Sequence, residues 1–203
     1  RWFGDEAAGT ARLLAPDGGL VGFGHSMGGA ALLMAAHRDP ALFDRLVLFE
    51  PVVMEPPTAP IDPDEVPLVV GARRRRRRFA STDEAYDNYS GKPPMSLMTP
   101  EALRAYVEWG FRRTASGDVE LRCDPEFESD TFAASWSNGV WDLLPGVDVP
   151  TVVVSGAVVE AGPSSASSLI AGRLPHAELV VLEHQTHFGP FSHPDEVAAL
   201  IAG

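Results

Sequence analysis

The sequence predicts an α/β protein in which a mainly parallel sheet is flanked by helices and interrupted by a helical insert. Two observations predict this class. Short apolar runs alternate with helix-like stretches towards both ends of the chain, which is the pattern of parallel strands joined by crossover helices. The middle of the chain carries apolar residues at helical spacing instead. We expect residues 1–55 and 145–203 to form one core, with residues 56–144 inserted between two strands as a helical cap.

The chain opens with a predicted helix, about Glu6 to Leu14, which ends at the turn Pro16-Asp17-Gly18-Gly19. The run Leu20 to Phe23 then predicts a strand. Because this run is almost continuously apolar, it is typical of a strand covered on both faces in the middle of a sheet. We therefore expect this chain to be an N-terminally truncated fragment, in which the first strands of the sheet are missing.

The strand breaks at Gly24-His25-Ser26-Met27-Gly28, and a helix-like stretch from Ala30 to His37 follows. A sharp strand-to-helix turn lifts a serine hydroxyl out of the backbone, and Gly24 and Gly28 are expected to provide space where a β-carbon would clash. The Met27 amide, at the start of the helix, can donate to a developing oxyanion. We predict that Ser26 is a nucleophile and that Met27 supplies an oxyanion donor.

The remaining elements follow in order. The run Leu46 to Phe49 predicts a second strand, which Glu50 follows directly. Capping and proline signals predict helices in the insert from Ser81 to about Tyr89, from Pro100 with Leu103, Val107 and Phe111 on one face, and from Asp124 to about Trp136. After the insert we expect a strand within Pro150–Gly156, a helix at 164–174, a strand at 179–182 and a last helix from Pro194.

Composition narrows the classes of partner. The net charge of −12 disfavours nucleic acid, and no apolar run approaches the roughly 18–20 residues of a membrane span. The single cysteine, Cys123, excludes an internal disulfide framework. The run Arg73 to Arg78 is either a polyanion or targeting patch or, as we favour, a solvated helix face beside Asp83 and Glu84. We expect a cytoplasmic globular enzyme with a small-molecule substrate; the composition leaves its oligomeric state open.

These motifs resemble those of the α/β-hydrolase superfamily, in its serine-nucleophile branch. The segment Gly24 to Gly29 looks like the nucleophile elbow of that fold. The resemblance extends to the sixth, seventh and eighth strands of the fold, matched by Leu46–Glu50, Pro150–Gly156 and Leu179–Leu182. It implies an α/β-hydrolase fold with a variable cap, and a second oxyanion donor on a segment that precedes the elbow and is missing from this chain.

The resemblance also implies a catalytic histidine. His187-Phe188-Gly189-Pro190 lies where the family places this residue, between the last strand and a terminal helix. His25 lies inside the elbow and is expected to be a structural neighbour. The other histidines have weaker contexts: His37 near a helix end, His176 and His193 beside prolines, and His184 after the same strand as His187. We predict that His187 is the general base.

The acid departs from the commonest family pattern. Most relatives carry an aspartate three residues after the glycine that ends the seventh strand, and that position here is Val159. Two substitutes remain: Glu160 in the same loop, and Glu50 at the end of the sixth strand. Glu50 resembles the acid placement of some haloalkane dehalogenases and emerges at the carboxyl edge of the sheet, where such folds gather catalytic groups. We prefer Glu50 and keep Glu160 as the alternative acid.

Together these residues predict a serine hydrolase that cleaves an ester, thioester or similar acyl bond of a small, fairly apolar substrate through a Ser26-His187-Glu50 triad and an acyl-enzyme. We expect no metal and no nucleotide or flavin cofactor, because the sequence has no clustered His/Cys spacing, no phosphate-loop lysine and no dinucleotide fingerprint. The alternatives are carbon–carbon bond hydrolysis or a cofactor-free haloperoxidase-like activity on the same fold, or a non-catalytic binding protein.

Overall fold

A computed structural model describes residues 2–159 and 162–203 of the chain. They divide into two compact units. Unit 1 comprises Arg1–Thr58, Ser135–Pro190 and Pro194–Gly203, and unit 2 comprises Ala59–Ala134 and Phe191–His193. Residues 135–144, which we expected at the end of the insert, belong to unit 1, because Val140, Trp141 and Leu144 are buried in its core.

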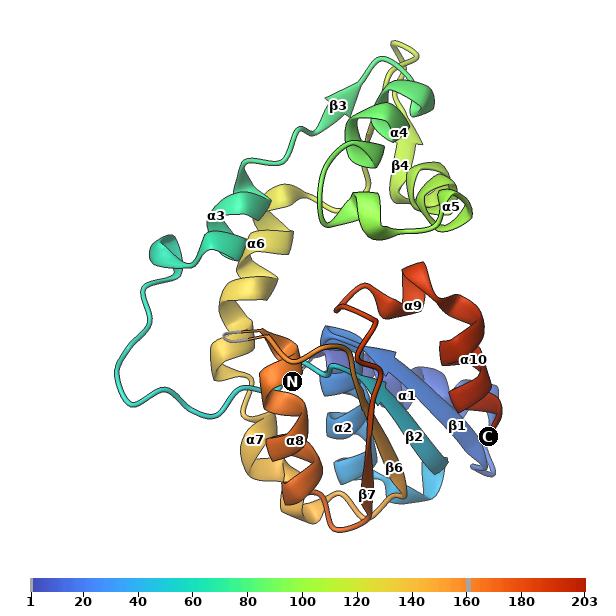
Figure 1. The fold of residues 1–203 in the computed structure, drawn as a ribbon, viewed down its shortest axis with the longest axis vertical. Coiled ribbons are helices and arrows are strands. Elements are labelled where there is room, and N and C mark those ends of the chain that lie inside the picture. Colours follow the sequence, from blue (N-terminus) through green and yellow to red (C-terminus); the bar gives the residue numbers. More distant parts are fainter. Residues whose placement is uncertain (1, 160–161) are drawn as a thin grey trace. The chain divides into compact units, whose positions relative to one another are not determined.

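Unit 1 is built on a four-stranded parallel sheet with strand order β1-β2-β6-β7 (Figure 1). The strands are β1 (Leu20–His25), β2 (Phe43–Phe49), β6 (Thr151–Ser155) and β7 (Ala177–Val181). His25 pairs with Phe49, and Phe49 with Val154, so the carboxyl ends of β1, β2 and β6 lie level. The residues that follow β1 and β2, Ser26 and Glu50, therefore emerge at one edge of the sheet. The predicted α/β class is confirmed.

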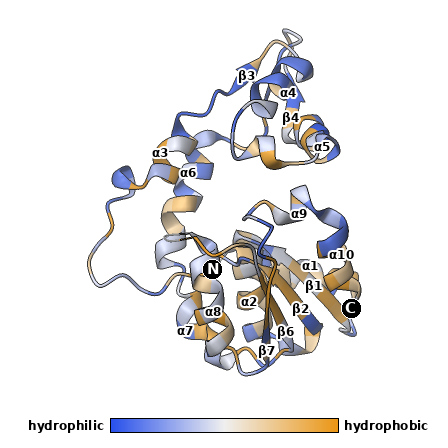
Figure 2. Ribbon diagram, in the orientation of Figure 1, coloured by the Kyte–Doolittle hydropathy of each residue, from blue (hydrophilic) through white to orange (hydrophobic). Residues whose placement is uncertain are grey.

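The described helices of unit 1 include those predicted. These are α1 (Trp2–Leu14) and α2 (Met27–Arg38), which are longer than expected, α8 (Pro163–Arg173), shifted by one residue, and α10 (Pro194–Ala202), which begins at Pro194 as expected. Two short helices were not predicted: α7 (Val140–Leu143), and α9 (Gly189–Ser192), which is divided between the two units. Short 3-10 turns lie at Pro40–Leu42, Ser135–Ser137 and Leu144–Gly146. In Figure 2 the parallel strands carry much of the hydrophobic colour of unit 1, as expected for strands covered by helices.

β1 lies at one end of the strand order among the described residues, and on one of its faces the side chains of Val21 and Phe23 are exposed by 46% and 37%. On its other face β1 is closely covered, because a β-carbon on Gly22 would lie 2.8 Å from Leu46.

Unit 2 is not purely helical, which corrects the expected helical cap. It contains α3 (Pro67–Arg73), α4 (Thr82–Ser90), α5 (Pro100–Gly110) and α6 (Pro125–Ala134), with 3-10 turns at Pro63–Glu65 and Met95–Leu97. It also contains a three-stranded antiparallel sheet, order β3-β5-β4, formed by Arg78–Phe79, Val119–Leu121 and Phe111–Arg113. Strands of two or three residues are too short to leave a recognisable period in the sequence.

Phe111 is the residue at which the prediction for unit 2 fails. We placed it on the α5 face with Leu103 and Val107, but α5 ends at Gly110 and Phe111 begins β4, opposite Leu121. All three side chains are still buried together in the core of unit 2. The turn that follows β4 contains Gly117 at φ 92°, a conformation that glycine adopts without steric cost.

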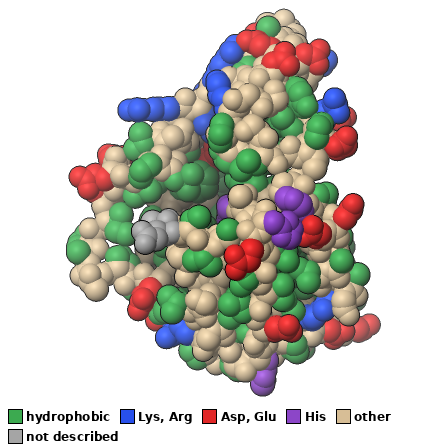
Figure 3. Space-filling model, viewed as in Figure 1, with side chains coloured by type: hydrophobic (Ala, Val, Ile, Leu, Met, Phe, Trp, Pro, Cys, Tyr) green, Lys and Arg blue, Asp and Glu red, His purple; other side chains and the backbone are tan. Residues whose placement is uncertain are grey.

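The arginine run, Arg73 to Arg78, is a mostly irregular charged segment and not a helix face, which corrects the expected element. Only Arg73 lies in α3, and the chain then runs without regular structure into β3. Its arginines pair with acidic residues of unit 2: Arg73 with Asp64, Arg75 with Glu128, Arg76 with Glu84, Arg77 with Asp124 and Arg78 with Glu120. Figure 3 shows basic and acidic side chains close together in this part of the chain. Of the two acidic neighbours named from the sequence, Glu84 contacts the run, through Arg76.

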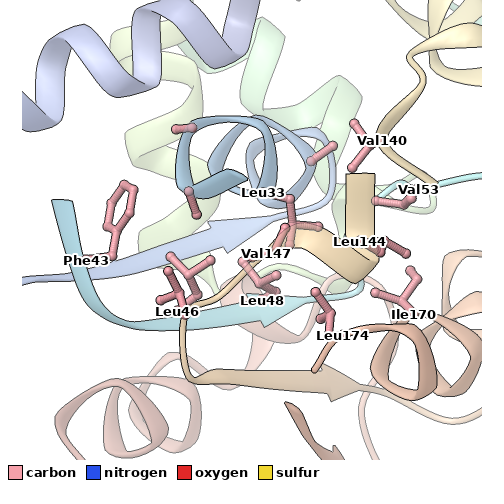
Figure 4. Close-up of a cluster of buried hydrophobic side chains, with 14 of the residues drawn as sticks. Leu33, Phe43, Leu46, Leu48, Val53, Val140, Leu144, Val147, Ile170 and Leu174 are labelled. Atoms are coloured by element: carbon pink, nitrogen blue, oxygen red, sulfur yellow. The ribbon is translucent and has the colours of Figure 1, made fainter. Parts of the chain in front are cut away.

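The hydrophobic core of unit 1 lies on both faces of the parallel sheet. Figure 4 shows the larger cluster, where side chains of α2, α7 and α8 meet those of β2, including Leu33, Leu46, Leu48, Val140 and Ile170. A smaller cluster on the other face joins Phe49 and Val154 to Val197 of α10. Because β2 is packed on both faces, the position of Glu50 at its end is firmly fixed. No helix among the described residues is long and apolar enough to cross a membrane.

Candidate active site

Ser26 sits in a strained turn between β1 and α2. Its backbone has φ 56° and ψ −122°, outside the conformations that ordinary residues prefer. The turn is held by β2 and the segment after it: the Ser26 amide donates to the Phe49 carbonyl and the Ser26 carbonyl accepts from the Val52 amide, both at 3.0 Å. Such strain persists only where the surrounding structure enforces it, and it is typical of functional positions.

Two glycines near Ser26 leave no space for a β-carbon, and one of them is not the glycine that we expected. A β-carbon on Gly24 would lie 2.7 Å from backbone atoms of Gly29, as predicted for a tight elbow. Gly28, in contrast, has nothing within 4 Å of its β-carbon position, so the predicted clash there is wrong. The clash occurs at Gly29, where a β-carbon would lie 2.7 Å from Pro51. The close approach of α2 to the segment after β2 sets this requirement.

His187 lies between Ser26 and Glu50. Its Nε2 is 3.1 Å from Ser26 Oγ, and its Nδ1 is 2.8 Å from Glu50 Oε2. These residues come from three segments, the elbow after β1, the end of β2 and the loop after β7, and they are up to 161 positions apart in the chain. The His187 side chain is 27% exposed, so solvent reaches part of it. The structure therefore brings together the three residues predicted as nucleophile, base and acid.

Glu50 is buried, with 1% of its side chain exposed, and both of its oxygens are engaged. Oε2 contacts His187, and Oε1 accepts a hydrogen bond from the Gly156 amide at 2.8 Å. Its backbone has φ 42°, and Ser26 and Glu50 are the two non-glycine residues with positive φ in the part of the chain that the structure describes. A buried carboxylate needs such donors, because an unpaired charge away from water is very costly.

The other predicted site residues are placed as follows. Met27 is the first residue of α2, where backbone amides have no acceptor within the helix, so its amide can bind an anionic oxygen. Glu160, the alternative acid, lies outside the described residues. Val159, at the usual family position of the acid, is 57% exposed. Within the described residues no group of three or more His, Cys, Asp or Glu side chains is arranged to hold a metal ion.

Three residues support this arrangement; Gly156 and Gln185 were not recognised from the sequence, whereas His25 was expected to be a structural neighbour. Gly156 supplies the amide that binds Glu50, and His25 contacts His187 through a hydrogen bond of 2.8 Å to its carbonyl. Gln185, buried in the loop before His187, donates to Glu196 at 2.8 Å and accepts from the Ala157 amide through its backbone carbonyl. Gly156 could have been found from the sequence, because it is the glycine that ends a predicted strand. The contacts of His25 and Gln185 depend on the fold.

Three of the remaining histidines contact other side chains. His184 contacts Glu196 at 2.8 Å, His176 contacts Asp148 at 3.1 Å, and His193 contacts the hydroxyl of Ser192 at 2.8 Å. His37 is exposed near the end of α2, as expected.

The comparisons with known proteins agree with this fold. The model of the Alpha/beta hydrolase family matches residues 3–200. No curated protein sequence matches the chain. Among solved structures, the peroxisomal alpha-beta-hydrolase Lpx1 of Saccharomyces cerevisiae is similar with a TM-score of 0.82 and 21% identity, over 99% of this chain and 58% of that one.

Two further structures are similar at lower scores. An E-2-(acetamidomethylene)succinate hydrolase has a TM-score of 0.75 at 21% identity, over 98% of this chain and 71% of that one. A thermophilic esterase from Thermogutta terrifontis has 0.64 at 20% identity, over 98% and 69%. At these identities the likeness concerns the fold, and the chain spans 58% of the length of the yeast protein. Because the family model matches almost the whole of its length, the chain belongs to the alpha/beta hydrolase family.

Proposed function

We propose that this chain carries the nucleophile, base and acid of a serine hydrolase, with Ser26, His187 and Glu50 in these roles. The observation that carries the proposal is the continuous path from Ser26 Oγ to His187 Nε2, at 3.1 Å, and from His187 Nδ1 to Glu50 Oε2, at 2.8 Å. A serine hydroxyl is a weak nucleophile until a base can take its proton, and the base needs a partner that fixes its tautomer.

The reaction then follows from these contacts. His187 Nε2 takes the proton of Ser26 Oγ as this oxygen attacks the acyl carbonyl, and the Met27 amide binds the oxyanion that forms. His187 gives the proton to the leaving group, whose bond to the acyl carbon breaks. Water, deprotonated by the same nitrogen, attacks the acyl-enzyme, and Ser26 leaves with the proton.

Glu50 holds His187 in the productive tautomer throughout this cycle. Because a carboxylate oxygen only accepts, Nδ1 of His187 must carry a proton, which leaves Nε2 free to act as the base. When His187 becomes an imidazolium, the buried carboxylate stabilises its charge. The Gly156 amide donates to Oε1 at 2.8 Å and keeps the carboxylate oriented.

For the substrate we propose an ester, thioester or similar acyl compound of small size and fairly apolar character. The structural relatives include esterases and a thioesterase domain, which supports acyl transfer to water as the reaction. Unit 2, inserted in the chain between β2 and β6, is proposed to act as the cap that selects the substrate. A cytoplasmic location stays a prediction.

The test is hydrolysis of chromogenic esters of increasing acyl length by the purified chain and by Ser26→Ala. We expect turnover of the short esters and a fall of at least about 10³-fold in kcat in the variant, because no other group replaces the nucleophile. Ser96→Ala, an exposed serine of unit 2, is the matched control and should keep full activity. Inertness towards every ester would contradict the proposal.

A fluorophosphonate probe separates the alternatives if the esters are inert. Labelling of Ser26 without ester turnover would favour carbon–carbon hydrolysis or haloperoxidase-like chemistry, since the nucleophile would be active on a different substrate. Absence of labelling would favour a binding protein that keeps the fold.

A further inference from the structure

His25 precedes the proposed nucleophile, and its ring lies against the ring of His187. The two ring centroids are 4.6 Å apart with an interplanar angle of 41°. In addition, His25 Nε2 lies 2.8 Å from the backbone carbonyl oxygen of His187. Since a carbonyl oxygen only accepts hydrogen bonds, Nε2 of His25 must carry the proton and donate it. One side chain therefore contacts both the backbone and the ring of the proposed base.

The loop that carries His187 is held on both sides of this residue by other bonds. The Gln185 carbonyl accepts from the Ala157 amide at 2.9 Å, and the Gly189 amide donates to the Thr186 carbonyl at 2.8 Å. His25 supplies the bond at His187 itself, across 162 positions of the chain. Because Ser26 is the next residue after His25, this bond ties the backbone of the base directly to the strand that carries the nucleophile.

The charge state of His25 suits this place. Burial, with the positive charge of neighbouring His187, lowers the pKa of His25 to about 4. Its ring is therefore neutral at neutral pH and can lie against His187 while His187 carries two protons. A second imidazolium there would oppose the charge that must form on His187 during acyl transfer.

We propose that His25 is a positioning residue for His187. Its Nε2–H fixes the carbonyl oxygen of His187, and this bond keeps Nε2 of His187 within reach of Ser26 Oγ. The proposal rests on the proposed function for its effect on turnover, but the contact itself can be tested without substrate. His25 transfers no proton in the reaction and acts only through His187.

Two variants of equal side-chain length separate the hydrogen bond from the space that the residue fills. His25→Gln keeps an N–H donor four bonds from Cα, whereas His25→Met fills similar volume without a donor. We expect His25→Met to lower kcat about 10- to 100-fold with KM unchanged, because a small misplacement of a catalytic group is costly. His25→Gln should recover most of this loss. Equal kcat in the two variants, or wild-type kcat in His25→Met, would overturn the proposal.

A proton NMR measurement tests the same point without substrate. The Nδ1 proton of His187, shared with Glu50, gives a strongly downfield resonance when this hydrogen bond is ordered, and we expect it in the wild type and in His25→Gln but broadened or lost in His25→Met. If the wild type hydrolyses no ester and this pattern still holds, the proposed function fails and the positioning role stands. A sharp resonance in His25→Met would overturn the positioning role, and His25→Phe replaces that variant if it does not fold.

Discussion

The two units of this chain use carboxylates in contrasting ways. In unit 1, Glu50 is buried and contacts the imidazole ring of His187, a type of side chain that can take up and release a proton. In unit 2, Glu120 lies between Arg78 and Arg112, which stay charged at every pH that proteins tolerate. A permanently charged partner fixes structure, whereas a titratable partner can follow a proton through a reaction. This difference supports the proposal that Glu50, rather than Glu120, has a chemical role.

The backbone shows the same contrast. Ser26 and Glu50, both in unit 1, are held at positive φ, whereas the residue of unit 2 with positive φ among those described is Gly117, for which this conformation costs little. Strain in unit 1 is thus confined to the two residues that contact His187. Unit 2 is held by a core around Phe79 and by arginine pairs on its surface.

The largest effect that this contrast predicts is on turnover. Glu50→Gln keeps the shape of the side chain but can present an N–H to His187, which favours the wrong tautomer, and we expect kcat to fall about 10³- to 10⁴-fold. The matched variant in unit 2, Glu120→Gln, should leave kcat unchanged. Steady-state kinetics on a chromogenic ester measures both. Loss of turnover in Glu160→Gln, with Glu50→Gln active, would reassign the acid.

The next effect is on the stability of unit 2. Phe79 is 1% exposed and packs against Phe111, with ring centroids 5.8 Å apart. We expect Phe79→Ala to destabilise unit 2 by about 3–5 kcal/mol, because it leaves a cavity in a small core. Hydrogen exchange should show lost protection in α4 and α5 and retained protection in β2 and β6. Equal loss in both sets of elements would show that the units unfold as one.

A pH effect distinguishes the titratable groups of the two units. The folded pKa of His25, about 4, is below its ordinary value of 6.5, so the unfolded chain binds more protons between these values and stability rises with pH across that window. The free energy of unfolding rises by at most about 1.4 kcal/mol per pH unit. The rise across that window is about 2–3 kcal/mol.

In unit 2, the Ala80 amide and Arg76 hold the pKa of Glu84 below 4.5, so its contribution is lost only at lower pH. Urea unfolding from pH 4.5 to 7 is the measurement, and His25→Gln should give a shallower rise than the wild type. An unchanged slope in this variant would assign the acid sensitivity to other groups.

The smallest effects concern ion pairs. Arg75 and Glu128 are each 22% exposed, and Arg75 also contacts the hydroxyls of Tyr89 and Tyr106. We expect Arg75→Met to cost about 1–2 kcal/mol in urea unfolding. Arg12 pairs with Asp39 at the surface of unit 1 and is 48% exposed. We expect Arg12→Gln to lower the free energy of unfolding by less than about 1 kcal/mol. If Arg12→Gln cost more free energy of unfolding than Arg75→Met, the arginine run would not stabilise unit 2.

Much of unit 1 could be predicted because its signals are local. The run from Leu20 to Gly29 contains the strand, the turn and the start of the helix in sequence order, and Ser26 follows from that pattern. The apolar run before Glu50 likewise fixes the end of β2. His187 required the family resemblance, because nothing in its own neighbourhood distinguishes it from His184.

The rest depends on contacts between distant segments. The need for glycine at position 29 comes from Pro51, and the role of His25 comes from a carbonyl 162 positions away. In unit 2, the position of Phe111 fits a helical spacing as well as a strand. Its pairing with Leu121 decides that it lies in a strand. Periodicity describes a segment alone, so it cannot report which partner a segment will find.

We propose that Ser26, activated by His187 and Glu50, is the nucleophile, and labelling by a fluorophosphonate followed by peptide mapping with mass spectrometry tests this assignment. We expect a single adduct, on Ser26, which forms more slowly in Glu50→Gln and at an unchanged rate in Glu120→Gln. An adduct on another serine, or none on the folded chain, would contradict it.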